Sequence, residues 1–305
     1  MRTFTLKGLF VTAVFMLLGC LTIHAADGDL ITKQITIKLE KAGTLPSKIG
    51  DTKKYKITNL KIMGEINGTD LCFIRNMAGP VNGFDHLERK LATLDLSGSK
   101  IVKGGDSYYN YYDKGYYTSD DVIGAHAFSG CRSLTSLTLP SGVTSIGEYA
   151  FSGCSGLTSL TLPSSVTTIG YSAFRGCSGL TSLALPSSVT AIGGSAFEGC
   201  SGLTSIYVSW ESPLSIAAST FKDANTEKCI LYVPKGTYDD YWLSNWGIFA
   251  NIVEYDATGI DHITTSGEAK EISRYAADGQ RLEVPAKGLN IVKYSDGSVK
   301  KVVVQ

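Results

Sequence analysis

The sequence predicts a solenoid, a fold in which short coils of similar sequence stack along one axis. One unit recurs almost four times between residues 122 and 210, and its period never shifts. Phenylalanines mark the unit every 23 residues, at Phe128, Phe151, Phe174 and Phe197. Cysteines keep the same spacing, at Cys131, Cys154, Cys177 and Cys200. Such a period is typical of solenoids, because a single unit is too small to bury its apolar face and must stack on its neighbours.

Within each unit the pattern predicts a short strand followed by turns. Residues 160–162 alternate leucine, threonine and leucine, as in a strand with one buried face. Pro163 ends this strand, because proline has no N–H to donate to a ladder. Val166 and Ile169 form a second apolar group, and Gly176 is placed to close a helical turn. Burial of each large side chain contributes about 1.5–3 kcal/mol, so the coils can sustain a core without a metal ion.

The four repeat cysteines are expected to be free thiols, although cysteines in an exported protein invite a disulfide interpretation. Each occupies the same position of its coil, so neighbours lie one strand spacing, about 4.8 Å, apart with parallel Cα–Cβ bonds. A disulfide needs converging Cβ atoms about 3.8 Å apart. We therefore interpret these cysteines as small buried apolar residues.

The segments on either side of the repeats are expected to be degenerate coils and caps, which cover the open ends of a solenoid. Alternating or apolar runs predict strands at residues 35–39, 59–64, 91–97, 229–234 and 252–255. Thr69 and Thr237 are the expected N-caps of two short helices, and Asn67-Gly68-Thr69 is interpreted as a turn and cap, not as a glycosylation site. About seven coils follow, a stack roughly 30 Å long.

A leader sequence predicts that the protein is exported. Arg2 and Lys7 precede the apolar run 9–18, which is too short to span a bilayer and is typical of a secretory leader. Cleavage before Ala26 is the favoured outcome, because the residues after Cys20 are apolar. The alternative is a lipoprotein leader, whose cleavage would leave a lipidated Cys20 as the chain's anchor in a membrane.

Six of the sixteen tyrosines fall within ten residues, at Tyr108, Tyr109, Tyr111, Tyr112, Tyr116 and Tyr117. No helical or alternating period organises them, and glycines and polar residues flank them, so an irregular excursion from the solenoid is expected. One interpretation is that the rings fold back over the coils. The other is that they form a contact surface for a partner, since tyrosine dominates adaptable recognition loops.

The residues show no pattern of an enzyme. The histidines are scattered singly, and the sequence contains no zinc-binding His-Glu-x-x-His, no phosphate-binding glycine loop and no nucleophile elbow. No spacing supports a calcium site among the aspartates near the tyrosines. We expect no catalytic residue, metal or cofactor. The formal net charge is +0 and no basic cluster stands out, so nucleic acid is not an expected partner.

Leu-x-x-Leu-x-Leu within a coil of this length is the leucine-rich repeat pattern. The motif that recurs from Val122 to about Trp210 is Ile-Gly-x-x-Ala-Phe-x-Gly-Cys-x-x-Leu-x-x-Leu-x-Leu-Pro-x-x-Val. This motif closely resembles the BspA-like leucine-rich repeats of bacterial surface proteins. The last 35 residues resemble the C-terminal sorting-type β-modules of secreted bacterial proteins, with Asp-Gly pairs at 278–279 and 296–297 as expected hairpin turns.

The resemblance implies a leucine-rich repeat solenoid at the bacterial surface or outer membrane, or secreted, that adheres to proteins of host or neighbouring cells. The alternative is a glycan-binding protein of a nutrient-capture system that stacks sugars on the tyrosines, Trp242 and Trp246. The chain then divides into a signal peptide (1–25), an N-terminal cap (26–58), degenerate coils with the tyrosine segment (59–121), regular repeats (122–210), a C-terminal cap (211–255), a linker (256–270) and a β-hairpin tail (271–305).

Overall fold

The computed structural model describes residues 30–79 and 89–255, together with the backbone of four strands between 271 and 304. The expected leader with Cys20, the expected linker and both Asp-Gly pairs lie outside the described residues. No helix in the described part of the chain is long and apolar enough to cross a membrane.

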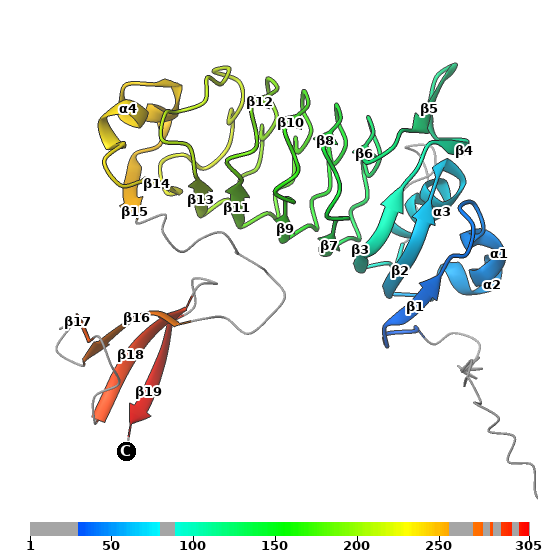
Figure 1. The fold of residues 1–305 in the computed structure, drawn as a ribbon, viewed down its shortest axis with the longest axis horizontal. Coiled ribbons are helices and arrows are strands. Elements are labelled where there is room, and N and C mark those ends of the chain that lie inside the picture. The colour runs from blue at the N-terminus through cyan, green and yellow to red at the C-terminus, as the bar shows by residue number, and fades with distance from the viewer. Residues whose placement is uncertain are drawn as a thin grey trace, which may run out of the picture.

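One parallel sheet runs the length of the stack (Figure 1). Its nine strands, in spatial order, are β1 (Ile35–Lys38), β2 (Asn59–Ile66), β3 (Thr93–Ile101), β7 (Ser136–Thr138), β9 (Ser159–Thr161), β11 (Ser182–Leu185), β13 (Ser205–Val208), β14 (Ile230–Pro234) and β15 (Asn251–Tyr255). The sheet is two strands longer than expected, because β1 and β15 of the two caps join the same ladder. At one strand spacing per coil the stack is roughly 40 Å long, not 30 Å.

The ladder register confirms the predicted alternation. Leu137 pairs with Leu160, and Leu183 pairs with Ile206, and all four side chains are buried. The serines and threonines between them face outward in matching rungs, so that Ser136 lies beside Ser159. Each coil therefore contributes apolar side chains to one continuous core and, apart from Ala184 and Tyr207, short polar side chains to the outer face.

A second parallel sheet, which the sequence did not predict, lines another side of the coils. Its strands have two residues each: β6 (Val122–Ile123), β8 (Ser145–Ile146), β10 (Thr168–Ile169) and β12 (Ala191–Ile192). The turn that follows each of these strands is not α-helical. After β10, for example, the Cys177 N–H donates to the Phe174 oxygen, three residues back, at 3.1 Å. Gly176 does close this turn in the left-handed region, with φ 70°.

The phenylalanines form a buried column through the coils. Adjacent rings are nearly parallel, with centroids 5.0–5.4 Å apart along the four repeat positions. Phe221 of the C-terminal cap extends the column at 5.2 Å from Phe197. All five rings are almost completely buried, so each fills space that two neighbouring coils share.

The four repeat cysteines are free and buried, as predicted. The Sγ atom of Cys177 donates to the Phe151 oxygen of the preceding coil at 3.1 Å, and Cys154 and Cys200 make the equivalent contacts. Burial raises the pKa of Cys131 to about 11 and that of Cys200 to about 12. At neutral pH these thiols are protonated and hold neighbouring coils together.

Three helices accompany the first two strands: α1 (Leu45–Ile49), α2 (Asp51–Lys54) and α3 (Gly68–Ala78). The expectation that Thr69 caps α3 is wrong, because Asn67 is the N-cap and its Oδ1 accepts from the Thr69 N–H at 3.1 Å. Buried Asp70 completes a capping box by accepting from the Asn67 N–H, and it also accepts from the Leu45 N–H. The cap thus ties α3 to α1.

The C-terminal cap consists of β14, α4 (Tyr238–Trp242), the 3-10 helix η1 (Asn245–Ile248) and β15. Trp246 seals the last coil: it is 0% exposed and its Nε1 donates to the Leu214 oxygen at 2.8 Å. Trp242 does not seal the last coil, since its side chain is 50% exposed. Thr237 stands at the N-cap of α4, but its hydroxyl donates to the Pro234 oxygen and makes no cap.

The tail contains the expected antiparallel hairpins. Its strands are β16 (Glu271–Ala276), β17 (Arg281–Leu282), β18 (Gly288–Tyr294) and β19 (Val299–Val304), in the order β17-β16-β18-β19. All three pairings are antiparallel.

Candidate functional site

The tyrosine segment is a β-hairpin and not the irregular excursion that was expected. Strands β4 (Gly104–Tyr111) and β5 (Lys114–Thr118) pair antiparallel, with Tyr109 opposite Tyr116. Figure 1 shows this hairpin next to α3, beyond β6 at the end of the row formed by β12, β10, β8 and β6. Its two-residue turn requires φ 51° at Tyr112, a conformation that glycine or asparagine usually provides. The turn therefore carried no recognisable signal in the sequence.

Three of the six tyrosines pack closely on the solenoid, and the half-exposed ring of Tyr111 lies stacked 6.1 Å from the His126 ring. Tyr108 is 3% exposed and its hydroxyl donates to the Ala125 oxygen at 2.8 Å, and burial raises its pKa to about 12. Tyr109 and Tyr116 each lie with their ring centres 5.0 Å from the His126 ring. These three rings fold back on the coils, as one of the two interpretations expected, and they fix the hairpin to the first regular coil.

A buried arginine on α3 supports the same contact. The Arg75 guanidinium lies 4.5 Å from the centre of the Tyr109 ring, a cation–π geometry. Its Nη1 donates to the carbonyl oxygens of His126 at 2.6 Å and Ala127 at 2.9 Å. Arg75 therefore joins α3, the hairpin and the first regular coil, and gives the hairpin a rigid base.

From this base a column of rings runs along the turns of the coils. Tyr109 stacks on His126, and His126 stacks on Tyr149 at 5.0 Å with the planes 5° apart. His126 and Tyr149 hold equivalent positions 23 residues apart, both with positive φ (59° and 54°), so the repeat itself aligns their rings. Tyr171 of the next coil meets Tyr149 edge to face at 5.5 Å.

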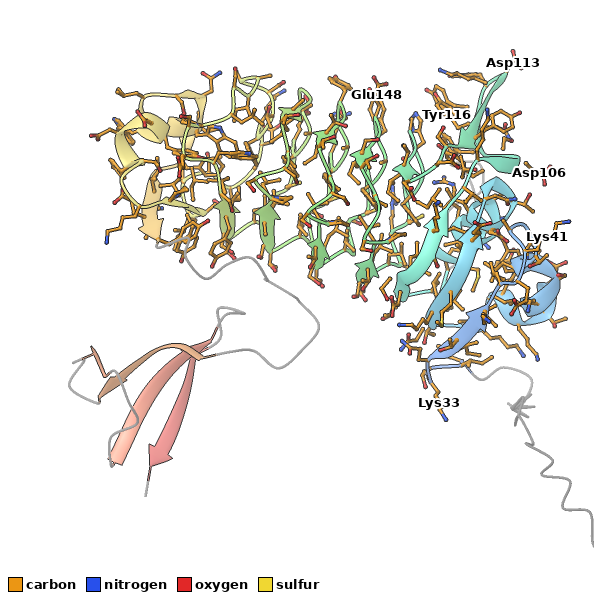
Figure 2. All side chains as sticks on the ribbon, viewed as in Figure 1. Lys33, Lys41, Asp106, Asp113, Tyr116 and Glu148 are labelled. Carbon is orange, nitrogen blue, oxygen red and sulfur yellow. The ribbon has the colours of Figure 1, made fainter. Side chains whose placement is uncertain are left out.

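Four rings of this surface are open to solvent. Tyr112 is 87% exposed, Tyr117 is 62%, Tyr111 is 52% and Tyr171 is 47%. Figure 2 shows Asp113, Tyr116 and Glu148 along the same edge of the molecule, so carboxylates border the rings. We call this surface the aromatic face; it consists of Tyr109, Tyr111, Tyr112, Tyr116, Tyr117, His126, Tyr149 and Tyr171.

The stacking geometry decides what the aromatic face can bind. In the column, ring faces are covered by the neighbouring rings, so ring edges and hydroxyls remain for a ligand. A sugar that stacks on an aromatic residue needs a free ring face. Such faces are confined to the outer tyrosines, which also offer the large apolar area and polar tips typical of protein recognition.

The imidazole of His126 lies among three of the rings of the aromatic face, those of Tyr109, Tyr116 and Tyr149. Burial among the rings, and then the nearby Arg75 charge, lower the pKa of this imidazole below its usual 6.5. Glu148 acts in the opposite direction as a lesser contribution. The imidazole is therefore neutral near pH 7, which suits a ring stacked beside an arginine.

Sequence reasoning did not single out Arg75, His126, Tyr149 or Tyr171. The 23-residue interval between His126 and Tyr149 was the available signal, since equivalent positions of a solenoid lie side by side. Neither the hairpin's contact with His126 nor that of Arg75 follows from any local pattern.

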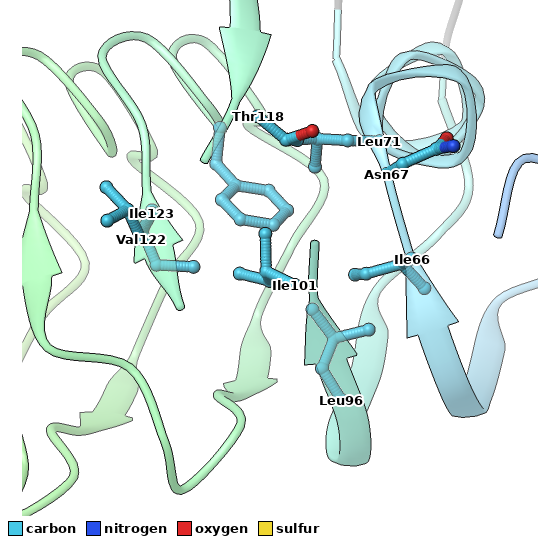
Figure 3. A pocket seen from close by; sticks show the side chains of 9 residues that line it. Ile66, Asn67, Leu71, Leu96, Ile101, Thr118, Val122 and Ile123 are labelled. Atoms are coloured by element: carbon cyan, nitrogen blue, oxygen red, sulfur yellow. The ribbon is translucent and has the colours of Figure 1, made fainter. Parts of the chain in front are cut away.

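Other hollows of the described chain suit a ligand less well. The cavity among Ile66, Leu71, Ile101 and Phe128 is apolar and has a volume of about 10 Å³ (Figure 3), room for one water at most. An open depression is lined by the Arg175–Glu198 ion pair together with glycines and short polar side chains, and it has no aromatic anchor. The described residues contain no group of three His, Cys, Asp or Glu side chains that could hold a metal ion.

Residues 121–240 match the family model described as "BspA type Leucine rich repeat region", in six copies. Residues 121–240 are BspA-type leucine-rich repeats. The family resemblance expected from the sequence is therefore confirmed, and the match reaches beyond the four regular units into the C-terminal cap. His126, Tyr149 and Tyr171 of the aromatic face lie within the BspA-type repeats, and the hairpin precedes them. A search of curated proteins found no match to the chain.

Several solved structures are similar to the chain. The pneumococcal vaccine antigen PcpA is 19% identical with a TM-score of 0.37, and the match covers 65% of this chain and 57% of PcpA. A leucine-rich repeat protein from Bacteroides ovatus is 22% identical with a TM-score of 0.30, covering 48% and 40%. A leucine rich cell surface protein from Faecalibacterium prausnitzii is 20% identical with a TM-score of 0.32, covering 66% and 63%. The chain thus spans less than two thirds of the length of each.

Proposed function

We propose that the protein is an exported, non-enzymatic binding protein of the bacterial surface that adheres to proteins of host or neighbouring cells through the aromatic face. The observation that carries this proposal is the arrangement of the hairpin: exposed Tyr111, Tyr112 and Tyr117 stand on a base fixed by Tyr108 and Arg75. The BspA-type repeats and the N-terminal leader support a location outside the cytoplasm.

Protein is the favoured partner because of what the surface offers. Specific protein interfaces depend on a few aromatic or arginine anchors near their centre. The outward rungs of the regular strands are mostly serine and threonine, which bury little area. Tyr207 of β13 is an exception, but its ring is covered by Tyr232, on which it stacks at 4.4 Å. The aromatic face supplies adjacent rings that are exposed. Tyrosine freezes few torsions when it binds, and a fixed hairpin base lowers the ordering cost further.

Glycan binding remains a second candidate, and one observation favours it. On α4 the rings of Tyr238 and Trp242 are parallel within 7°, with centroids 6.4 Å apart, and both are exposed. Carboxylates of Asp239 and Asp240 on the same helix could accept hydrogen bonds from sugar hydroxyls. This site lies on the C-terminal cap, so it can be tested separately from the aromatic face.

The test uses two matched variants on protein and glycan arrays. Tyr111→Ser, Tyr112→Ser and Tyr117→Ser together remove exposed rings of the hairpin and leave the packed Tyr116 in place. Tyr238→Ser with Trp242→Ser is the matched change on the cap. We expect the hairpin variant to lose binding to extracellular matrix proteins, with its unfolding free energy changed by less than about 1 kcal/mol. The cap variant should bind these proteins as the wild type does. Full protein binding by a stably folded hairpin variant would refute the proposal.

A further inference from the structure

Both ends of the long sheet are incompletely covered. Among the described residues β1 pairs with β2 alone and β15 with β14 alone, so each end presents an edge strand. The apolar ladder shows the same feature: Leu60 and Leu231 are 0% exposed, whereas the terminal rungs Ile35 and Ile252 are only partly buried. An edge of this kind can accept a further strand.

The C-terminal end also exposes apolar side chains around its edge strand. Leu243 is 82% exposed, and Trp242, Ile248 and Val253 are each exposed by more than two fifths. Clustered exposure of large apolar residues marks an interaction surface more often than an ordinary surface. The exposed Leu30 is the corresponding apolar residue close to β1.

The two ends carry opposite charge. Residues 30–58 at the β1 end contain seven lysines against Glu40 and Asp51. Residues 211–255 at the β15 end contain six carboxylates against three lysines. Figure 2 shows Lys33 and Lys41 at the β1 end of the stack. Two like ends therefore repel each other, and two unlike ends attract.

We propose that a second copy of the chain docks end to end, so that β15 of one molecule lies beside β1 of the next. This continues the parallel direction of the sheet. In the register that the ladder already follows, Ile252 comes opposite Ile35 and Val253 opposite Thr36. The contact is heterologous, because each copy uses a different end, and it generates open rows of molecules. It involves neither the aromatic face nor the protein partner proposed above, although it uses the end of the molecule that carries the second-candidate glycan site at Tyr238 and Trp242.

The acidic residue of β15 is compatible with this contact. Glu254 accepts hydrogen bonds from the backbone N–H groups of Gly236 at 2.9 Å and Tyr238 at 3.0 Å. These hydrogen bonds keep the Glu254 carboxylate bound to the backbone of its own molecule. Lysines near β1 oppose the pairing of two β1 edges, which leaves the β15 edge as the suitable partner.

Exchanging the charges of the two ends tests the proposal in the full chain. One variant carries Lys33→Glu, Lys38→Glu and Lys41→Glu; the other carries Asp239→Lys and Asp240→Lys, and circular dichroism checks that both fold. In sedimentation velocity the wild type should associate with rising protein concentration at an ionic strength of about 0.01 M. It should dissociate at about 1 M, where the Debye length is only about 3 Å and the attraction between the ends is screened. Each variant alone should stay monomeric, because its two ends now repel. Their equimolar mixture should associate again.

Cross-linking of introduced thiols with a short bismaleimide tests the register independently of charge, because a direct disulfide does not fit opposite positions of parallel strands. In a Cys72→Ser background, a variant with both Thr36→Cys and Val253→Cys should form a ladder of covalent oligomers on a denaturing gel after treatment with a short bismaleimide, and either single variant should remain a monomer. A wild type that is monomeric at every concentration and salt would overturn the proposal. Equal cross-linking of the single Val253→Cys variant would also overturn it, because that result would place two like ends together.

Discussion

Phe174 offers the most direct test of the stacked core. Its ring is 0% exposed and lies between the rings of Phe151 at 5.0 Å and Phe197 at 5.3 Å. Phe174→Ala removes a ring that three coils share, and backbone ladders on both sides limit how far the coils can close the space. Phenylalanine-to-alanine changes in such cores cost about 3–5 kcal/mol, and we expect Phe174→Ala to fall in the upper half.

The magnitude is best judged against two other positions. Phe128 has only one phenylalanine neighbour in the column, so Phe128→Ala loses one ring pair fewer than Phe174→Ala. Its unfolding free energy should therefore fall by about 0.5–1.5 kcal/mol less. Arg175 is adjacent to Phe174 in sequence, but its side chain is 55% exposed and pairs with Glu198. Arg175→Ala should change stability by about 1 kcal/mol at most.

Urea unfolding followed by far-ultraviolet circular dichroism gives the three free energies. The slope of the transition should be the same for all variants, since a change in slope would indicate a different amount of surface exposed. Tryptophan fluorescence adds a local reading of the C-terminal end, where Trp210, Trp242 and Trp246 all lie. A Phe174→Ala midpoint equal to that of Arg175→Ala would refute the assigned register of the column.

Three further predictions concern other parts of the molecule. The four repeat cysteines should resist alkylation until the protein is denatured, because they are buried and burial raises their pKa values. Burial also raises the pKa of Cys72, but this thiol is partly exposed and should react in the native state. A disulfide between two repeat cysteines, detected by mass spectrometry, would contradict this. His126 has a lowered pKa, so its contribution to stability should be complete above about pH 6.5 and be lost as the pH falls through that lowered value; His126→Tyr, which copies Tyr149, should remove this part of the pH dependence in thermal unfolding, and an unchanged profile would contradict it. If Cys20 is lipidated, labelled fatty acid should be incorporated and Cys20→Ala should abolish the label, whereas a mature N-terminus at Ala26 would exclude lipidation.

The repeat core was predictable because its signal is redundant. Every coil repeats the same apolar positions, so the register at Leu160 could be checked against Leu137 and Leu183 in the sequence alone. The free cysteines followed from the same register through simple geometry. The second sheet was missed because two-residue strands such as Thr168–Ile169 are too short to show any alternation.

The aromatic face was predictable only in part. The crowding of tyrosines marked the segment, but the division into packed and exposed rings depends on His126, in the coil that follows the hairpin, and on Arg75, on α3. The choice of Asn67 over Thr69 as helix cap likewise depends on Asp70, whose carboxylate is buried against α1. Contacts of this kind are set by tertiary packing, which local propensity does not encode.

Because the coils repeat every 23 residues, the length of the solenoid can change without changing the aromatic face. The aromatic face ends at Tyr171, and Phe174 to Leu203 merely repeat the geometry of the preceding coils. Duplication or deletion of one 23-residue unit beyond Tyr171 would therefore move the C-terminal cap by one strand spacing, about 4.8 Å, and leave every contact of the hairpin unchanged. Recombination between such similar segments can adjust the distance between the two ends stepwise while the recognition surface stays the same.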